Sequence, residues 1–165
     1  MKKIFLILLC CFFATSAFAK SSSLQLSLVP DVALEPRTTF INGASIGIWS
    51  ENPQTAFTLG IVNGSTGDSS GLTLGLLGNY AENYRGVQLA WLANYASGTL
   101  SGVQWSAFNY AGRLNGLQIG FLNYSEASDQ GVQIGLINIM NDTQQWFSNL
   151  PNEVAPAMVF VNWRF

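Results

Sequence analysis

Apolar and polar residues alternate in a short segment that recurs along the chain. In 86–91, Val87, Leu89 and Trp91 are apolar, and a glutamine and an alanine stand between them. A period of two over about eight residues is typical of a β-strand with two different faces. The same pattern predicts strands over 43–50, 56–63, 71–79, 86–94, 102–109, 116–123 and 131–138.

These strands are copies of one repeat of about fifteen residues, Gly-(Val/Leu)-Gln-(Ile/Leu)-(Gly/Ala) followed by Asn. We interpret its amide residues as structural: Asn tolerates the backbone of a strand end, and a buried Gln must find hydrogen-bond partners. The asparagines are Asn63, Asn79, Asn94, Asn109, Asn123 and Asn138, and the glutamines are Gln88, Gln104, Gln118 and Gln133.

The polar segments between the copies, such as 81–85, 111–115 and 125–130, read as turns. An irregular stretch follows the last copy, and 157–165 alternates again, which gives eight strands. The chain is therefore predicted to be all-β, and no segment from residue 20 onward reads as a helix.

Three architectures compete for such strands, and a soluble sandwich or barrel is disfavoured because the repeat strands over 71–138 carry no charged residue on either face. The pattern favours an antiparallel up-and-down membrane barrel, with the aliphatic face against lipid and the Gly/Gln face inside, because a sheet in a bilayer must close. The alternative is a β-solenoid of ~15-residue coils that stacks the Asn and Gln residues as ladders. A solenoid needs inward apolar residues on more than one side, and 125–130 offers only Ala127.

The first residues have the pattern of a secretory leader. Lys2 and Lys3 precede an apolar run over 4–13, and Ala17 and Ala19 form a small-residue cleavage site. We divide the chain into a signal peptide (1–19), an N-terminal extension (20–42) and a repeat domain (43–165), with a further strand over 24–29 left open. The predicted location is the outer membrane, with the periplasm or the cell exterior as alternatives.

Composition argues against most catalytic chemistry. Charged residues make up 10% of the chain, against about 25% in typical domains, and the net charge of −2 disfavours nucleic acid as a partner. Histidine is absent, and both cysteines, Cys10 and Cys11, lie in the predicted leader. Histidine-based triads and zinc sites therefore cannot form. We predict no enzyme activity, no metal site and no cofactor.

Two resemblances support export. The terminal residues Trp163 and Phe165 resemble the C-terminal signature of Gram-negative outer-membrane β-barrels, which implies contact with membrane lipid and with the export and barrel-assembly machinery. The repeat over about 43–139 resembles a family of bacterial surface-repeat proteins. That resemblance implies surface exposure rather than a particular activity.

With both ends of a barrel in the periplasm, the connections 51–55, 80–85, 110–115 and 139–156 would face outward. The longest carries Trp146, Phe147 and Leu150, which we predict as a surface-contact site for a partner that the sequence does not specify. The predicted function is that of an exported structural or surface-interaction protein of the outer membrane without catalysis. The alternatives are a narrow-channel transport protein and a soluble exported β-solenoid binding protein.

Overall fold

The computed structural model describes residues 20–165, so the predicted signal peptide over 1–19 lies outside the described residues. These residues form strands and no helix: β1 (Ser21–Val29), β2 (Val32–Ala33), β3 (Phe40–Asn52), β4 (Thr55–Ala90), β5 (Ala93–Trp105), β6 (Phe108–Met140) and β7 (Ala157–Arg164). Within this range nothing helical has the length and hydropathy to cross a bilayer.

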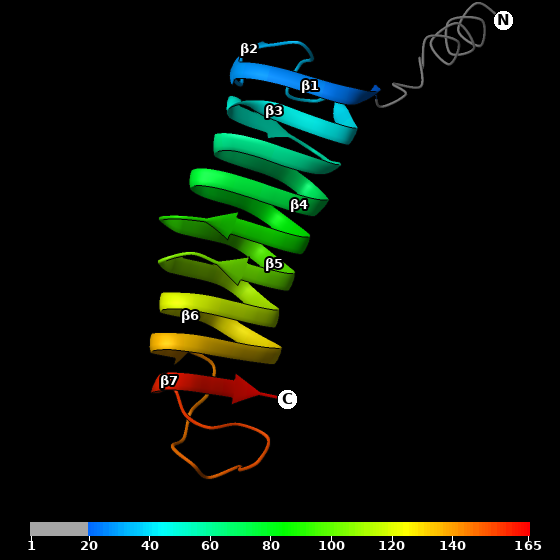
Figure 1. The fold of residues 1–165 in the computed structure, drawn as a ribbon. Coiled ribbons are helices and arrows are strands. Elements are labelled where there is room, and N and C mark those ends of the chain that lie inside the picture. The colour runs from blue at the N-terminus through cyan, green and yellow to red at the C-terminus, as the bar shows by residue number, and fades with distance from the viewer. Residues whose placement is uncertain (1–19) are drawn as a thin grey trace, which may run out of the picture.

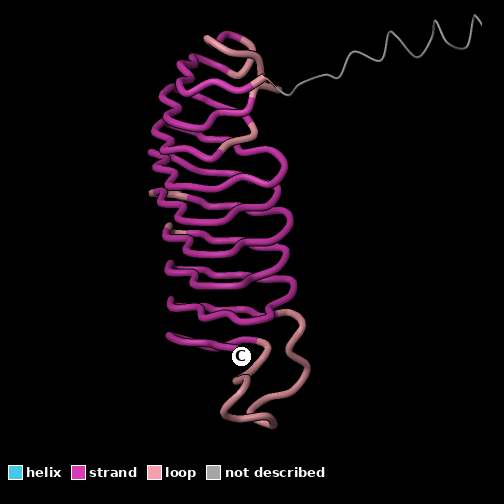
Figure 2. Tube along the Cα trace, turned by 90° about the vertical axis from the view of Figure 1, so that its right-hand side faces the viewer, coloured by secondary structure: helices cyan, strands magenta, loops and turns pink. Residues whose placement is uncertain are grey.

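The strands wind into a β-solenoid of about seven coils (Figures 1 and 2). The order in the sheet is β2-β1-β3-β4-β5-β6-β7, and β4 and β6, with 36 and 33 residues, each continue around more than one coil. Equivalent repeat positions lie directly above one another, since Asn79 pairs with Asn94 and Gly102 with Gly116.

The prediction of an eight-stranded antiparallel barrel is therefore wrong, and the solenoid alternative is confirmed. Successive copies pair in parallel, and within residues 20–165 antiparallel pairing is confined to the ends, between β1 and β2, between β6 and β7 and at the bridge from Glu153 to Arg164. The segments 80–85 and 110–115, predicted as exposed loops, are extended backbone inside β4 and β6. The strand over 157–165 is β7, which ends the stack instead of closing a cylinder.

Small and polar side chains fill the solenoid, which explains why counting large apolar residues disfavoured it. The segments between the copies supply Ala81, Tyr84, Ala111 and Leu114, all buried, and in the following coil the buried inward residues are serines. The interior of each coil is narrow and amide side chains occupy much of it, so the segments between the copies need to supply only a small volume of apolar side chains. The buried cluster on this side is completed by Ala96, Leu100 and Met140.

Two ladders of buried amides run along the interior. In the glutamine ladder, Gln104 Nε2 donates to Gln88 Oε1 (3.0 Å), Gln118 Nε2 to Gln104 Oε1 (2.8 Å) and Gln133 Nε2 to Gln118 Oε1 (2.8 Å). The asparagine ladder links Asn63, Asn79, Asn94, Asn109, Asn123 and Asn138 at 2.8–3.1 Å. Each Nδ2 of the asparagine ladder also donates to a backbone carbonyl. The glutamines are bonded inside the solenoid, whereas the asparagines, expected to mark strand ends, lie within β4, β5 and β6, and none of them has the left-handed backbone.

Both ends of the solenoid are finished by irregular segments and ion pairs. β1 pairs in parallel with β3, so the extension over 20–42 contributes the strand that the sequence left open. Near this end Arg37 pairs with Asp31 (2.9 Å) and Glu51 (3.2 Å). At the other end, Arg164 of β7 pairs with Asp142 (2.6 Å) of the preceding loop. These ion pairs lie where strand edges are free, and charge at a free edge is a known defence against edge-to-edge aggregation.

Candidate functional site

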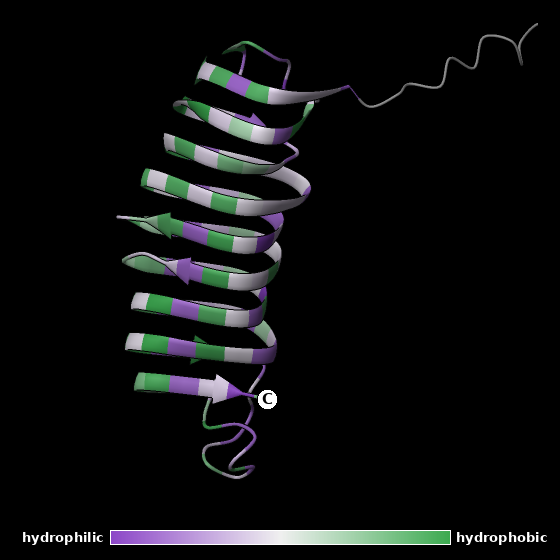
Figure 3. Cartoon of the chain, turned by 45° about the vertical axis from the view of Figure 1, so that its right-hand side comes forward, coloured by the Kyte–Doolittle hydropathy of each residue, from purple (hydrophilic) through white to green (hydrophobic). Residues whose placement is uncertain are grey.

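One side of the solenoid is an exposed apolar surface, because the amide ladders take the inward positions of the same strands. Side chains alternate along a strand, so inward Gln88 places Val87 and Leu89 outside. Trp91 at the following corner is 80% exposed, and Phe121, its counterpart two coils on, is 63% exposed. Apolar colour gathers along this side in Figure 3.

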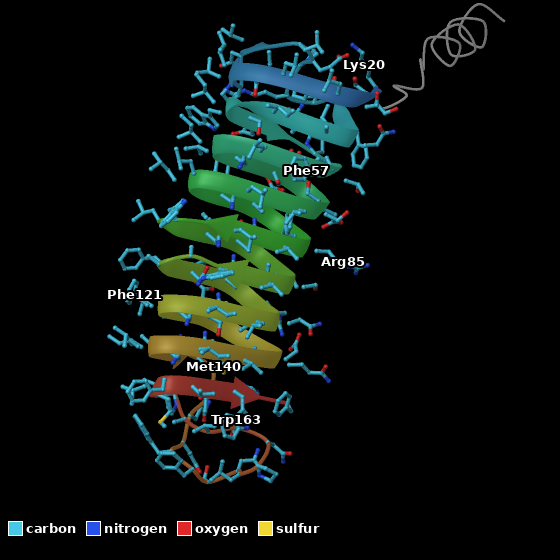
Figure 4. The ribbon with its side chains drawn as sticks, in the orientation of Figure 1. Lys20, Phe57, Arg85, Phe121, Met140 and Trp163 are labelled. Atoms are coloured by element: carbon cyan, nitrogen blue, oxygen red, sulfur yellow. The ribbon has the colours of Figure 1, made fainter. Side chains whose placement is uncertain are left out.

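We call this surface the apolar face. It consists of Leu24, Leu26, Leu28, Ile46, Ile48, Phe57, Leu59, Ile61, Leu72, Leu74, Leu76, Val87, Leu89, Trp91, Val103, Trp105, Leu117, Ile119, Phe121, Val132, Ile134, Leu136 and Val161. Among residues 20–165, no Asp, Glu, Lys or Arg belongs to it. Phe121 and Arg85 project from opposite edges of the solenoid in Figure 4.

A groove of about 1000 Å³ runs along the apolar face where the chain turns its corner. Small residues form the floor, and large apolar residues on either side form the walls. The floor consists of Gly60, Gly75, Ala90, Ser106, Ala107, Gly120 and Gly135; the walls are Leu59, Leu74, Leu89, Trp105, Ile119, Ile134 and Val161 on one side and Leu76, Trp91, Phe121 and Leu136 on the other. Phe160, which pairs with Gly135, lines the groove at its β7 end.

The floor residues lie beside the asparagine ladder of the interior. A Cβ at Gly75 would lie 2.5 Å from Asn79 Oδ1, and one at Gly135 would lie 2.7 Å from Asn123 Nδ2. Real Cβ atoms do not approach polar atoms so closely, so a side chain at these two glycines would displace its neighbours. Ala90 and Ser106, at the equivalent position of other coils, show that a small side chain can be accommodated beside Asn94 and Asn109. The floor residues therefore point into the interior, and the groove lies outside their backbone, between two rows of outward apolar side chains.

A column of tyrosines lies on the strand after the corner. Tyr95 stacks on Tyr110 with ring centroids 4.7 Å apart, and Tyr110 on Tyr124 at 5.5 Å. Tyr110 donates a hydrogen bond to the Glu126 carboxylate, which raises the pKa of Tyr110 to about 12. Burial, followed by a hydrogen bond to Glu51, raises the pKa of Tyr80 to about 12 as well.

The predicted contact residues lie away from the groove. Trp146, Phe147 and Leu150 are exposed in the loop between β6 and β7, and the Trp146 and Phe147 rings lie 6.1 Å apart. None of the three lines the groove. Their role as a contact site stays a prediction.

The terminal aromatics take part in the end of the solenoid. Trp163 Nε1 donates to Pro151 O (2.8 Å), and the backbone N–H of Phe165 donates to Asn152 O (2.8 Å). These contacts tie the last strand to the preceding loop. Since the strand ends a solenoid, Trp163 and Phe165 do not close a barrel. The predicted contact with export and barrel-assembly machinery stays a prediction.

A second, polar hollow of about 480 Å³ lies at the opposite edge, lined by residues such as Asp68, Asn83 and Arg85. The described residues contain no group of three or more His, Cys, Asp or Glu that could hold a metal ion.

Comparison with protein-family models, curated proteins and solved structures gives no match. The sequence placed the floor glycines on the inward side, as the structure does, but it did not predict the groove between the outward residues that flank them. The signal was a small inward residue between two outward apolar ones, as in Ile119, Gly120 and Phe121.

Proposed function

We propose that this chain is an exported, non-catalytic β-solenoid that binds a lipid surface through its apolar face. The observation that carries the proposal is a charge-free apolar surface extending from β1 to β7, with the charged side chains on the other sides and at the ends. The pattern of residues 1–19 supports export, and we infer the outer membrane as the lipid surface.

The size of the face supports a binding role. Neighbouring coils lie ~4.8 Å apart and residues along a strand ~3.3 Å apart, so the face measures roughly 40 Å by 15 Å. That is about 600 Å², at the upper limit of the largest apolar patch on a typical monomer. At about 25 cal/mol per Å², covering it contributes a gross ~15 kcal/mol, before the opposing cost of immobilisation.

The backbone makes this face suited to hydrocarbon. Each coil pairs with the coils before and after it, so the amides under the face are bonded inside the sheet. A lipid-facing surface must leave no backbone group unpaired, and here free edges occur only at the two ends. The tyrosine column after the corner suits the boundary with water, where Tyr gathers in membrane proteins.

The charge distribution points to uncharged or zwitterionic lipid. The net charge is −2, and Lys20, Arg37, Arg113 and Arg164 are engaged in ion pairs. Adsorption would therefore rest on apolar burial and not on attraction to anionic headgroups. The channel alternative finds less support, because hydrogen-bonded amides fill the solenoid interior.

Flotation with phosphatidylcholine vesicles tests the proposal. We expect the wild-type protein to float with the vesicles. The double substitution Trp91→Glu/Phe121→Glu should lower the bound fraction at least ~10-fold, because two carboxylates must then lose hydration. The control Ser97→Glu/Asn115→Glu adds the same charge at exposed positions away from the face and should leave binding unchanged.

Two results would refute lipid binding. One is a wild-type protein that stays in the protein fraction at the bottom of the gradient while the vesicles float without it. The other is a stable dimer in sedimentation velocity that the face double variant converts to monomers, which would show that a second copy covers the face.

A further inference from the structure

We propose that the groove in the apolar face holds one extended acyl chain of a single membrane lipid, with the headgroup left in water. This inference rests on the proposed function, because the face that meets the lipid surface is also the face that opens the groove. It assigns a ligand class to Trp91, Trp105 and Phe121.

The shape of the groove selects a long, thin ligand. Its lining begins at Leu59 and ends at Phe160 and Val161 on β7, and every coil in between contributes. Six steps of ~4.8 Å make it about 29 Å long. A bilayer core of ~30 Å contains two opposed layers of chains, so one chain needs about 15 Å and fits within the groove.

The lining excludes a peptide as the occupant. An extended peptide carries an N–H or C=O at each residue and loses several kcal/mol for every such group left unpaired in apolar surroundings. The groove offers no free sheet edge, since the strands beneath it pair with one another along the solenoid. Its one side-chain hydroxyl, that of Ser106, already bonds Phe108 O (2.7 Å) and Asn109 Oδ1 (2.8 Å). A hydrocarbon chain has no such groups to satisfy.

Charge complementarity excludes a free fatty acid held by its carboxylate. No Lys or Arg lines the groove, and Arg85 lines the polar hollow at the opposite edge. The anion would find no partner, whereas a lipid whose headgroup stays in water needs none. The occupant is therefore the chain of an intact lipid.

The distribution of the five tryptophans allows a direct test. Trp91 and Trp105 line the groove, whereas Trp49, Trp146 and Trp163 do not. The probe is a lysophosphatidylcholine with a brominated lauroyl chain, kept below its critical micelle concentration, because bromine quenches tryptophan fluorescence on contact. We expect saturable quenching that the substitution Trp91→Phe/Trp105→Phe abolishes while the remaining fluorescence persists.

A matched pair of phenylalanines separates the groove from the rest of the surface. Phe121 forms part of a wall, whereas Phe108, on the preceding coil, is 49% exposed and lies outside the groove. Phe121→Ala should weaken the apparent Kd about fourfold, the loss expected when the ring no longer covers about one methylene of the chain. Phe108→Ala should leave the Kd unchanged.

The outcomes distinguish this inference from the proposed function. Wild-type protein that floats with vesicles but shows no saturable quenching overturns the groove inference alone. Quenching that the Trp91→Phe/Trp105→Phe variant retains, or equal losses at Phe121 and Phe108, also overturns it. Saturable quenching confined to the groove tryptophans without vesicle flotation would support the inference and refute the proposed function.

Discussion

Replacing Gln118 by leucine tests whether the interior ladder holds the solenoid together. Gln118 accepts from Gln133 Nε2 (2.8 Å) and donates to Gln104 Oε1 (2.8 Å) and to Tyr124 O (3.3 Å). Leucine fills a similar volume but offers no polar atom. Gln133 Nε2 keeps Ile139 O (3.0 Å), whereas Gln104 Oε1 is left buried with no donor.

The expected loss follows from that orphaned oxygen. A buried unsatisfied acceptor costs about 1–3 kcal/mol and each of the two lost ladder bonds contributes about 1 kcal/mol, so Gln118→Leu should lower the free energy of unfolding by about 3–5 kcal/mol. Urea unfolding followed by far-UV circular dichroism measures this as a lower midpoint at an unchanged slope.

The ladder also predicts that neighbouring substitutions are not additive. Gln118→Leu leaves Gln104 Oε1 without a donor, but in the variant Gln104→Leu/Gln118→Leu that oxygen is no longer present. The acceptor left without a donor in the double variant is Gln88 Oε1. The double variant breaks three ladder bonds but leaves only one acceptor without a donor, so it should lose only about 1 kcal/mol more than one single variant, well below the sum of the two. Additive losses, or a Gln118→Leu protein as stable as the wild type, would refute the reasoning.

Two further predictions concern the packed side and the tyrosine column. Leu114→Ala, at a fully buried position, should lower the unfolding free energy by about 2–4 kcal/mol because of the cavity it leaves. The control Leu92→Ala, at a 52% exposed position, should change the unfolding free energy by less than about 0.5 kcal/mol. Equal losses for the two variants in a urea titration would contradict the assigned core. Glu126→Gln should lower the pKa of Tyr110 from about 12 towards its ordinary value of 10.0, because the carboxylate that favours the protonated phenol is removed. Since the folded pKa lies above the ordinary one, the stabilisation that this contact contributes is complete below pH 10.0 and is lost as the pH rises towards 12; an ultraviolet titration that Glu126→Gln leaves unchanged would contradict the contact.

The sequence was sufficient to predict the strands but not their pairing. Alternation identifies which side chains share a face, and it placed Gln88 and Val87 on opposite sides correctly. It contains no information about whether the next copy returns antiparallel or continues in the same direction. That choice depended on 80–85 and 110–115, where alanine and a single larger residue, Tyr84 or Leu114, suffice to fill the interior.

The polar composition of the interior was the second obstacle. A search for a core looks for large aliphatic residues, yet here the glutamines and asparagines are fully or almost fully buried while much of the aliphatic surface is exposed. Amides can replace an apolar core only where each finds an identical partner at a fixed spacing, and a parallel stack of equal repeats provides that spacing. The repeat length therefore held the decisive information.

The inverted distribution of polarity links the fold to the proposed binding role. Ordinary domains are stabilised by removing apolar side chains from water, and this chain leaves Trp91, Phe121 and their neighbours exposed. The amide ladders stabilise the coils without those side chains. Under the proposed function, burial of the apolar face therefore contributes to binding a lipid surface and not to folding. A surface-adsorbing protein requires this separation, because the interactions that fold it must not consume the surface with which it binds.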